Sequence, residues 1–289
     1  MTVGRLLIHL ILLTFSLFCI YSFLIVLGSS FASQNEIMTR GYSALPKKID
    51  LTAYKMLFRN SVVLDSYKIT TIVTLLGTLL GVFISGLLGY VMSRKDYAYR
   101  NHLAFYVFFT MLFSGGLVPS YILISRWLNL KNTIFALILP SAISAWNVML
   151  MRNFFKSVPD SLIEAAKIDG MGEFGIFLKI VLPISKPAFA TIALFYALGY
   201  WNQWYNSMLY TDRASLSMLQ FTLLKLTRDI EYLNSSEALQ YGAITAGTEI
   251  PTYGMRMAMC VVAAGPMVLI FPFFQRYFVK GITIGSVKG

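Results

Sequence analysis

The sequence predicts an all-α polytopic membrane protein with six transmembrane helices. Its 289 residues are 57% hydrophobic and only 13% charged, whereas a soluble globular domain carries about 25% charged residues. Long apolar runs recur along the chain, each near the ~20 residues that a helix needs to cross a bilayer. No polar segment is long enough to fold alone, so we expect a single transmembrane domain over residues 1–289.

Six apolar runs define the expected spans. The first run exceeds the roughly 7–15 apolar residues of a secretory signal core, so we expect it to be a retained helix. Pro140 and Pro187 lie in or near spans four and five, where proline kinks a helix or begins one. The spans cover residues 6–27, 69–92, 103–125, 133–151, 180–200 and 257–278.

The second span carries four glycines, which either form a seam for a packed helix or reflect ordinary glycine enrichment in membrane helices. They are Gly77, Gly81, Gly86 and Gly89. Outside the spans, the patterns at 51–58 and 216–226 predict short helices. Cys19 and Cys260 both lie in expected spans, so no disulfide framework is indicated.

The charge pattern indicates a membrane surface and the orientation of the chain. The net charge is +11, but the basic residues are spread over loops, which argues against nucleic acid and for anionic lipid headgroups. Six spans place both termini on one side, and eleven basic residues fall on each side. When the basic residues of the long loops after spans one and five are left out, the side with the termini has eleven basic residues and the opposite side has two. Because charges near span ends count most, we expect cytoplasmic termini.

The loop at about 152–179, between spans four and five, contains a short amphipathic helix by its own pattern. Ser161 and Glu164 have the spacing of a capping box, and Gly170 stands where a left-handed residue would end the helix. Ala165 and Ala166 would leave a small surface for another protein.

The motif Glu164-Ala165-Ala166, three residues, Gly170, nine residues, then Ile180-Val181-Leu182-Pro183 resembles the signature loop of ABC importer membrane subunits. Segments 113–121, 132–147 and 275–289 resemble the carbohydrate-uptake branch of these permeases, and most closely its polysaccharide and lipoprotein-type subgroup. The resemblance implies a cytoplasmic coupling helix, continuous with span five, at which a separate ATPase docks. The residues assigned to ATPase coupling are Ser161, Glu164, Ala165, Ala166, Asp169 and Gly170.

The resemblance also implies a function and a set of partners. The chain is expected to be the permease subunit of an ATP-driven oligosaccharide importer in a bacterial cytoplasmic membrane, with a substrate that contains uronic acids. Its partners would be a homologous permease, two ATPase subunits and an extracytoplasmic solute-binding protein.

The absence of nucleotide-binding, metal-binding and catalytic motifs from the sequence also favours a permease subunit. No Gly-x4-Gly-Lys-Ser/Thr phosphate loop occurs, so we expect no cofactor in this chain, and ATP and Mg²⁺ on the partner. His9 and His102 lack paired ligands, so we expect no metal site. Two alternatives remain: a secondary transporter would need inverted repeats and midplane ionisable groups, and an intramembrane enzyme would need a catalytic constellation, which we do not find.

Aromatic and amide side chains are candidates for a sugar pathway, because rings stack on sugar faces and amides pair with hydroxyls. Residues 200–206 lie at the outer end of span five, where an interfacial aromatic belt is the alternative that the sequence slightly favours. If the helix continues there, Trp201, Trp204 and Tyr205 form one stripe. The pathway candidates are Trp146, Asn147, Trp201, Asn202, Trp204 and Asn206.

Overall fold

The computed structural model describes residues 3–59, 61–233 and 251–286, and the elements within these ranges are all helical. The polar stretch 234–250 and residues 287–289, which end the C-terminal motif, lie outside the described residues. The described chain forms two compact units. One comprises Met1–Asp65 with Thr222–Pro266, and the other Ser66–Phe221 with Met267–Gly289.

Three long helices and three bent helix pairs are apolar enough to cross a membrane, which gives six spans when each pair counts once. The long helices are α1 (Val3–Ser30), α4 (Val62–Ser93) and α16 (Thr252–Ser286). The expected all-α, six-span fold is therefore confirmed.

Spans three to five are broken rather than continuous. The third bends by 111° between Arg100–Leu112 (α5) and Leu117–Trp127 (α6, Leu117–Ile122, with η1, Leu123–Trp127). The expected unbroken helix over 103–125 is wrong, because the chain is non-helical at 113–116, where two glycines follow Ser114. Gly116, the N-cap residue of α6, has a φ of +87°, a conformation that glycine adopts far more readily than other residues.

Proline marks the other two breaks, as the sequence predicts. Pro140 lies in a tight turn, η2 (Leu139–Ser141), after α7 (Ile134–Ile138), and the span resumes at 53° as α8 (Ala145–Phe155). Pro187 lies in the first turn of α12 (Lys186–Trp201), where its missing N–H is tolerated. The preceding half of span five, Glu173–Ile184, meets α12 at 86°. It is built from α10 (Glu173–Ile176), η3 (Phe177–Val181) and α11 (Leu182–Ile184).

Shorter helices complete both units. The helix expected at 51–58 is α3 (Thr52–Leu57), which follows α2 (Gln34–Arg40). In the same unit, the hydroxyl groups of Tyr54 in α3 and Ser30 at the end of α1 form a hydrogen bond. The helix expected at 216–226 is α14 (Leu219–Leu233). The remaining elements are α9 (Asp160–Ile168), α13 (Tyr205–Tyr210) and η4 (Ala214–Leu216).

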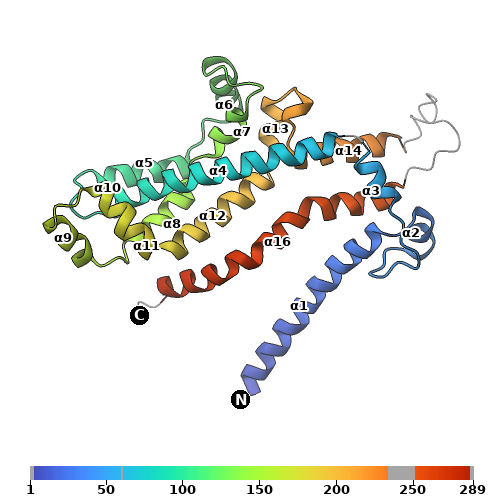
Figure 1. Ribbon diagram of the computed structural model, residues 1–289, viewed down its shortest axis with the longest axis horizontal. Helices are drawn as coiled ribbons and strands as arrows, with labels where there is room; N and C mark the ends of the chain where they lie inside the picture. The colour runs from blue at the N-terminus through green and yellow to red at the C-terminus, as the bar shows by residue number, and fades with distance from the viewer. Residues whose placement is uncertain (1–2, 60, 234–250, 287–289) are drawn as a thin grey trace. The chain divides into compact units, whose positions relative to one another are not determined.

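In the second unit, α4, α5, α8 and α12 run side by side, and α9 and α10 lie at the end of α4 near Ser93 (Figure 1). The glycines of α4 form the seam of this bundle. A Cβ atom at Gly77 would lie 2.5 Å from the ring of Tyr200, and one at Gly81 would lie 2.7 Å from the ring of Tyr196. The packing interpretation of the glycines is therefore correct, because the two rings occupy the space that larger residues would fill.

Hydrogen bonds hold the same two rings. The Tyr196 hydroxyl lies 2.8 Å from Ser85 Oγ and accepts from the Ser144 amide at 2.9 Å. The Tyr200 hydroxyl donates to the Ile138 carbonyl at 2.8 Å. α12 is thus bonded to α4 and to both sides of the break in span four.

We predict that Gly81→Ala destabilises the protein by about 1–3 kcal/mol, because the added methyl overpacks the seam. The matched control is Gly199→Ala in α12, where a Cβ atom meets nothing within 4 Å. The measurement is the thermal midpoint of the purified protein in detergent. Equal midpoints for the two variants would contradict the seam.

Candidate functional site

The segment 160–176, which joins spans four and five, begins with α9. The expected capping box is wrong: the N-cap is Pro159, which offers no side-chain hydrogen bond, and the helix begins at Asp160. Proline in an extended conformation starts the helix here, so Ser161 and Glu164 lie inside it with exposed side chains. Both residues are available to another protein rather than used to cap α9.

The two alanines differ in environment. Ala165 is exposed, whereas Ala166 is buried and packs with Ile163 in the hydrophobic core of the bundle. The expected small surface therefore consists of Ala165 alone, because the helix turns Ala166 inward.

Gly170 ends α9 in the left-handed conformation that the sequence predicts. Its φ is +78°, and its amide donates to the Lys167 carbonyl at 3.0 Å. Asp169 precedes it, exposed, at the C-cap. The expectation that this helix continues into span five is wrong, because the chain turns at Gly170 and α10 starts only at Glu173.

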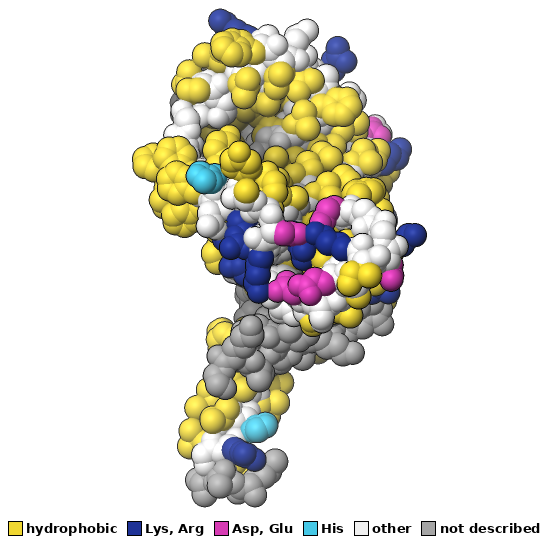
Figure 2. Space-filling view, turned by 90° about the vertical axis from the view of Figure 1, so that its left-hand side faces the viewer, with side chains coloured by type: hydrophobic (Ala, Val, Ile, Leu, Met, Phe, Trp, Pro, Cys, Tyr) yellow, Lys and Arg dark blue, Asp and Glu magenta, His cyan; other side chains and the backbone are white. Residues whose placement is uncertain are grey.

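Ion pairs fasten both ends of α9 to the segment that follows α4. At its start, Lys95 Nζ lies 2.7 Å from Asp160 Oδ2. Near its end, Lys167 Nζ pairs with Asp96 and lies 2.6 Å from Glu173 Oε1. We call these five residues the α9 clamp. Figure 2 shows Lys and Arg side chains gathered beside Asp and Glu side chains on this end of the molecule.

Further bonds extend the clamp into the bundle. The Tyr90 hydroxyl donates to Glu173 Oε2 at 2.6 Å, and Arg94 lies 3.1 Å from Asp96. Tyr90 is a core residue of α4 that packs on Phe155 and Phe177. The clamp therefore connects α9 to the end of α4 through side-chain contacts.

The clamp is stable at neutral pH. The hydrogen bond from Lys167, with a smaller contribution from Arg94, lowers the pKa of Asp96 from 3.8 to about 2 against the opposing effect of desolvation. A depressed carboxyl pKa stabilises the fold above the unfolded pKa, and this stabilisation is lost as the pH falls from 3.8 toward 2. The Lys167–Asp96 pair is thus intact throughout the range of about pH 5–8.

Sequence reasoning missed the clamp because its members lie far apart in the chain. Asp96 follows span two and Lys167 lies 71 residues later. Their only local signal is opposite charge in two loops that the topology places on one side of the membrane.

A cavity of about 440 Å³ lies where the break in span four faces α12. Its walls combine aromatic, hydroxyl and amide groups, and its lining contains no charged side chain. The lining residues are Ser141, Ser144, Trp146, Asn147, Phe195, Tyr196, Gly199, Tyr200 and Gln203. Trp146 is 62% exposed and Asn147 is buried, so two of the expected pathway residues line this cavity.

Gln203 is the cavity residue that sequence reasoning did not select. Its Nε2 donates to Ser141 Oγ at 2.9 Å, while its Oε1 is buried without a hydrogen-bond partner among the described residues. Burying an unpaired carbonyl oxygen costs about 1–3 kcal/mol. Such an atom is suited to accept a hydrogen bond from a bound hydroxyl.

The other expected pathway residues do not line the cavity. The helix ends at Trp201 and α13 begins at Tyr205, so the expected stripe of Trp201, Trp204 and Tyr205 is wrong. Trp201 is buried with its ring edge-on to Tyr67, at 5.7 Å between centroids. Trp204 is exposed and packs edge-on against Tyr205.

The two asparagines of this cluster bond their neighbours. Asn202 Nδ2 donates to the Leu198 carbonyl at 2.9 Å, which caps the end of α12. Asn206 Nδ2 reaches Ser141 Oγ at 3.4 Å. Asn206 therefore lies behind the cavity wall, and Asn202 lies outside it.

The chain is similar to known proteins over most of its length. Residues 74–284 match the family profile of the binding-protein-dependent transport system inner membrane component. Over 98% of this chain and 97% of the relative, the chain is 40% identical to the polygalacturonan/rhamnogalacturonan transport system permease protein YtcP of Bacillus subtilis (strain 168). It is 38% identical to protein LplC of the same organism, over 93% of this chain and 90% of the relative.

A solved structure shares the fold. It is a crystal structure of a bacterial ABC transporter involved in the import of the acidic polysaccharide alginate, with a TM-score of 0.81 and 28% identity, and 96% of each chain is covered. The profile extends over most of the chain, and the relatives match nearly end to end. This chain therefore belongs to the binding-protein-dependent transport family and is a multi-pass membrane permease subunit of an ABC sugar importer, a type of subunit that leaves ATP hydrolysis to a separate chain.

Proposed function

We propose that this subunit carries acidic, uronate-containing oligosaccharides across the cytoplasmic membrane. Support comes from two relatives that handle acidic polymers: a permease named for polygalacturonan and rhamnogalacturonan, and the alginate importer. Both galacturonan and alginate consist of uronic acid units. The observation that carries the proposal in this chain is the neutral, aromatic and amide-lined cavity beside the break in span four.

The cavity offers the chemistry that a sugar needs. Trp146 presents an exposed ring for stacking on a sugar face. Ser141, Asn147 and Gln203 supply donors and acceptors for hydroxyls. These neutral donors would also bond a uronate carboxylate, without the strong retention that a buried cation would impose.

We infer the rest of the assembly from the sequence and from the family. A homologous permease completes the pathway, two ATPase subunits bind ATP and Mg²⁺, and an extracytoplasmic binding protein delivers the substrate. This chain carries no phosphate loop, so it contributes no nucleotide site. Both termini lie in the cytoplasm, which places the 160–176 segment on the ATPase side.

The structure supports a route for coupling through this chain. The ATPases would contact the exposed side chains of α9, including Ser161, Glu164 and Ala165. The α9 clamp passes a displacement to α4 through Tyr90. α4 in turn packs through Gly81 and Gly77 against the rings of Tyr196 and Tyr200 of α12, and these two tyrosines line the cavity. ATP-driven closure would thereby change access to the cavity as a rigid-body motion.

Transport by the reconstituted importer tests whether the substrate is an acidic oligosaccharide. The complex in proteoliposomes, with its binding protein and ATP, should take up oligogalacturonates and not neutral oligosaccharides of equal length. Uptake of labelled sugar is the measurement. A preference for the neutral series would contradict the acidic substrate and would leave the family assignment unchanged.

For coupling, we predict that Gly170→Val weakens ATPase retention and transport while membrane insertion persists. The left-handed conformation costs a β-carbon residue about 1–2 kcal/mol, and the strain falls on the turn after α9. Gly172→Val is the matched control, because Gly172 has a φ of −72° and a Cβ atom there meets nothing within 4 Å.

The measurements are co-purification of the ATPase and uptake by the reconstituted complex. Equal behaviour of the Gly170→Val and Gly172→Val complexes would exclude a coupling role for the left-handed turn.

For the pathway, we predict that Gln203→Met lowers uptake by about tenfold, the effect of losing one substrate hydrogen bond. The thermal midpoint should change little, because the substitution removes the unpaired Oε1 along with the Nε2 bond to Ser141, and Asn206 still donates to Ser141 Oγ. Asn202→Ala is the control, since Asn202 lies outside the cavity and should retain normal uptake. Normal uptake by Gln203→Met would remove this cavity from the pathway.

A further inference from the structure

A second cavity, of about 500 Å³, lies where α4 ends, α5 begins, α8 ends and α9 begins. Its lining is rich in cations. It contains five basic side chains, Arg94, Lys95, Arg100, Arg152 and Lys156, and a single carboxylate, Asp160. Such an excess of positive charge in one concave site favours an anion.

Within the described part of the chain, two of the five cations are paired with carboxylates. Lys95 pairs with Asp160, and Arg94 pairs with Asp96. Arg152 Nε donates to the Met92 carbonyl at 3.2 Å, and Arg100 Nη1 to the Arg94 carbonyl at 3.4 Å. These carbonyls orient the two guanidinium groups but do not neutralise them.

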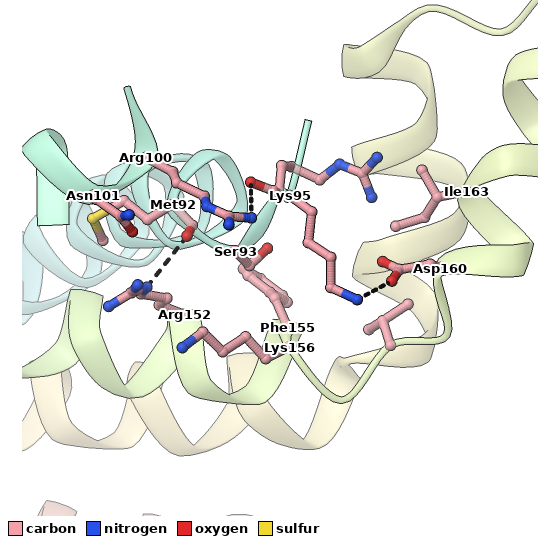
Figure 3. A pocket seen from close by; sticks show the side chains of 12 residues that line it. Met92, Ser93, Lys95, Arg100, Asn101, Arg152, Phe155, Lys156, Asp160 and Ile163 are labelled. Carbon is pink, nitrogen blue, oxygen red and sulfur yellow. Dashed lines mark hydrogen bonds and ion pairs between the residues drawn. The ribbon is translucent and has the colours of Figure 1, made fainter. Parts of the chain in front are cut away.

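The Lys156 ammonium makes no hydrogen bond or ion pair with a described residue. Figure 3 shows this group on the side of the cavity where Arg152 lies, with no dashed line to it. Desolvation, followed by the charges of Arg152 and Arg100, lowers the pKa of Lys156. The Nε atom of Arg94, also in the lining, is buried without a partner. Three cations that no described carboxylate neutralises, Arg100, Arg152 and Lys156, thus line one cavity.

The surroundings of the cavity are those of a membrane boundary. α5, which starts at Arg100 on the cavity wall, continues into an apolar span whose outer face exposes Phe105, Tyr106 and Leu112. Tyr99, which precedes Arg100, is also exposed, as is usual for aromatic residues at headgroup level. A molecule with a phosphate in the cavity could lay acyl chains along α5.

We propose that this cavity binds the phosphate of an anionic phospholipid headgroup, held by Lys156, Arg152 and Arg100. Several basic side chains in a pocket between transmembrane helices at their cytoplasmic ends fit such a headgroup. A free phosphate offers the same charge, but it would not use the apolar face that continues from the cavity.

Native mass spectrometry of the complete importer in detergent tests the proposal. We expect phosphatidylglycerol to bind more tightly than phosphatidylcholine with the same acyl chains. Lys156→Gln should weaken phosphatidylglycerol binding by about tenfold, the loss of one charge-assisted hydrogen bond. Lys156→Arg should restore it. Lys179→Gln is the matched control, because Lys179 is exposed and lies outside the cavity, so this substitution removes the same charge elsewhere.

Four results would overturn the proposal. Equal losses in Lys156→Gln and Lys179→Gln would indicate general charge attraction, and equal binding of the two lipids would exclude anion selectivity. Full displacement of phosphatidylglycerol by inorganic phosphate at equal concentration would identify a soluble-anion site. Loss of the ATPase from Lys156→Gln with unchanged lipid binding would identify a protein-docking surface. The thermal midpoint of each variant verifies that it is folded.

Discussion

The hydroxyl groups of Tyr196 and Tyr200 supply the hydrogen bonds that a broken transmembrane helix lacks. Inside a bilayer no water reaches a free backbone group, so every break needs internal partners. At the break in span four, the Ala142 amide donates to Leu139 rather than to Ile138, and Tyr200 donates to the Ile138 carbonyl instead. On the far side, Tyr196 accepts from the Ser144 amide. The break, the cavity and the glycine seam all depend on these two side chains.

Because of this dependence, the same two side chains support the bundle and line the neutral cavity. The rings of Tyr196 and Tyr200 pack on Gly81 and Gly77 with one face and line the neutral cavity with another part of their surface. A shift of α4 relative to α12 would therefore move both a packing contact and the wall of the cavity. Small displacements of tightly packed helices become discrete changes of state for this reason.

The sequence predicts the elements better than their junctions. Apolar runs locate the six spans, and Pro140 and Pro187 mark two of the breaks, because proline acts through its own backbone. The break at 113–116 was missed, since two glycines in an apolar run are equally compatible with a continuous membrane helix. Gly170 was predicted with its conformation, whereas the capping box at Ser161 was not found, because Pro159 already fixes the start of α9.

The site residues that the sequence does not predict are those that depend on contacts between distant parts of the chain. Nothing local joins Asp96 to Lys167 or identifies Gln203 as the amide that faces the cavity. Trp201 and Asn202 had the right chemistry for a sugar pathway, but α12 ends at Trp201 and the chain turns away. Side-chain type can be read from a sequence, whereas the direction in which a side chain points depends on where each helix stops.

The basic cavity and the α9 clamp share two residues, and this links the proposed lipid site to coupling. Lys95 and Asp160 line the cavity and also form the ion pair at the start of α9. An anion bound beside Lys95 would compete with Asp160 for the same ammonium group and would relieve the repulsion among Arg100, Arg152 and Lys156. Because α9 is held at one end by this pair and at the other by Lys167, loosening one end alone would let the helix pivot about the other. The lipid composition around this subunit would then influence how firmly the ATPase-facing helix is attached to span two.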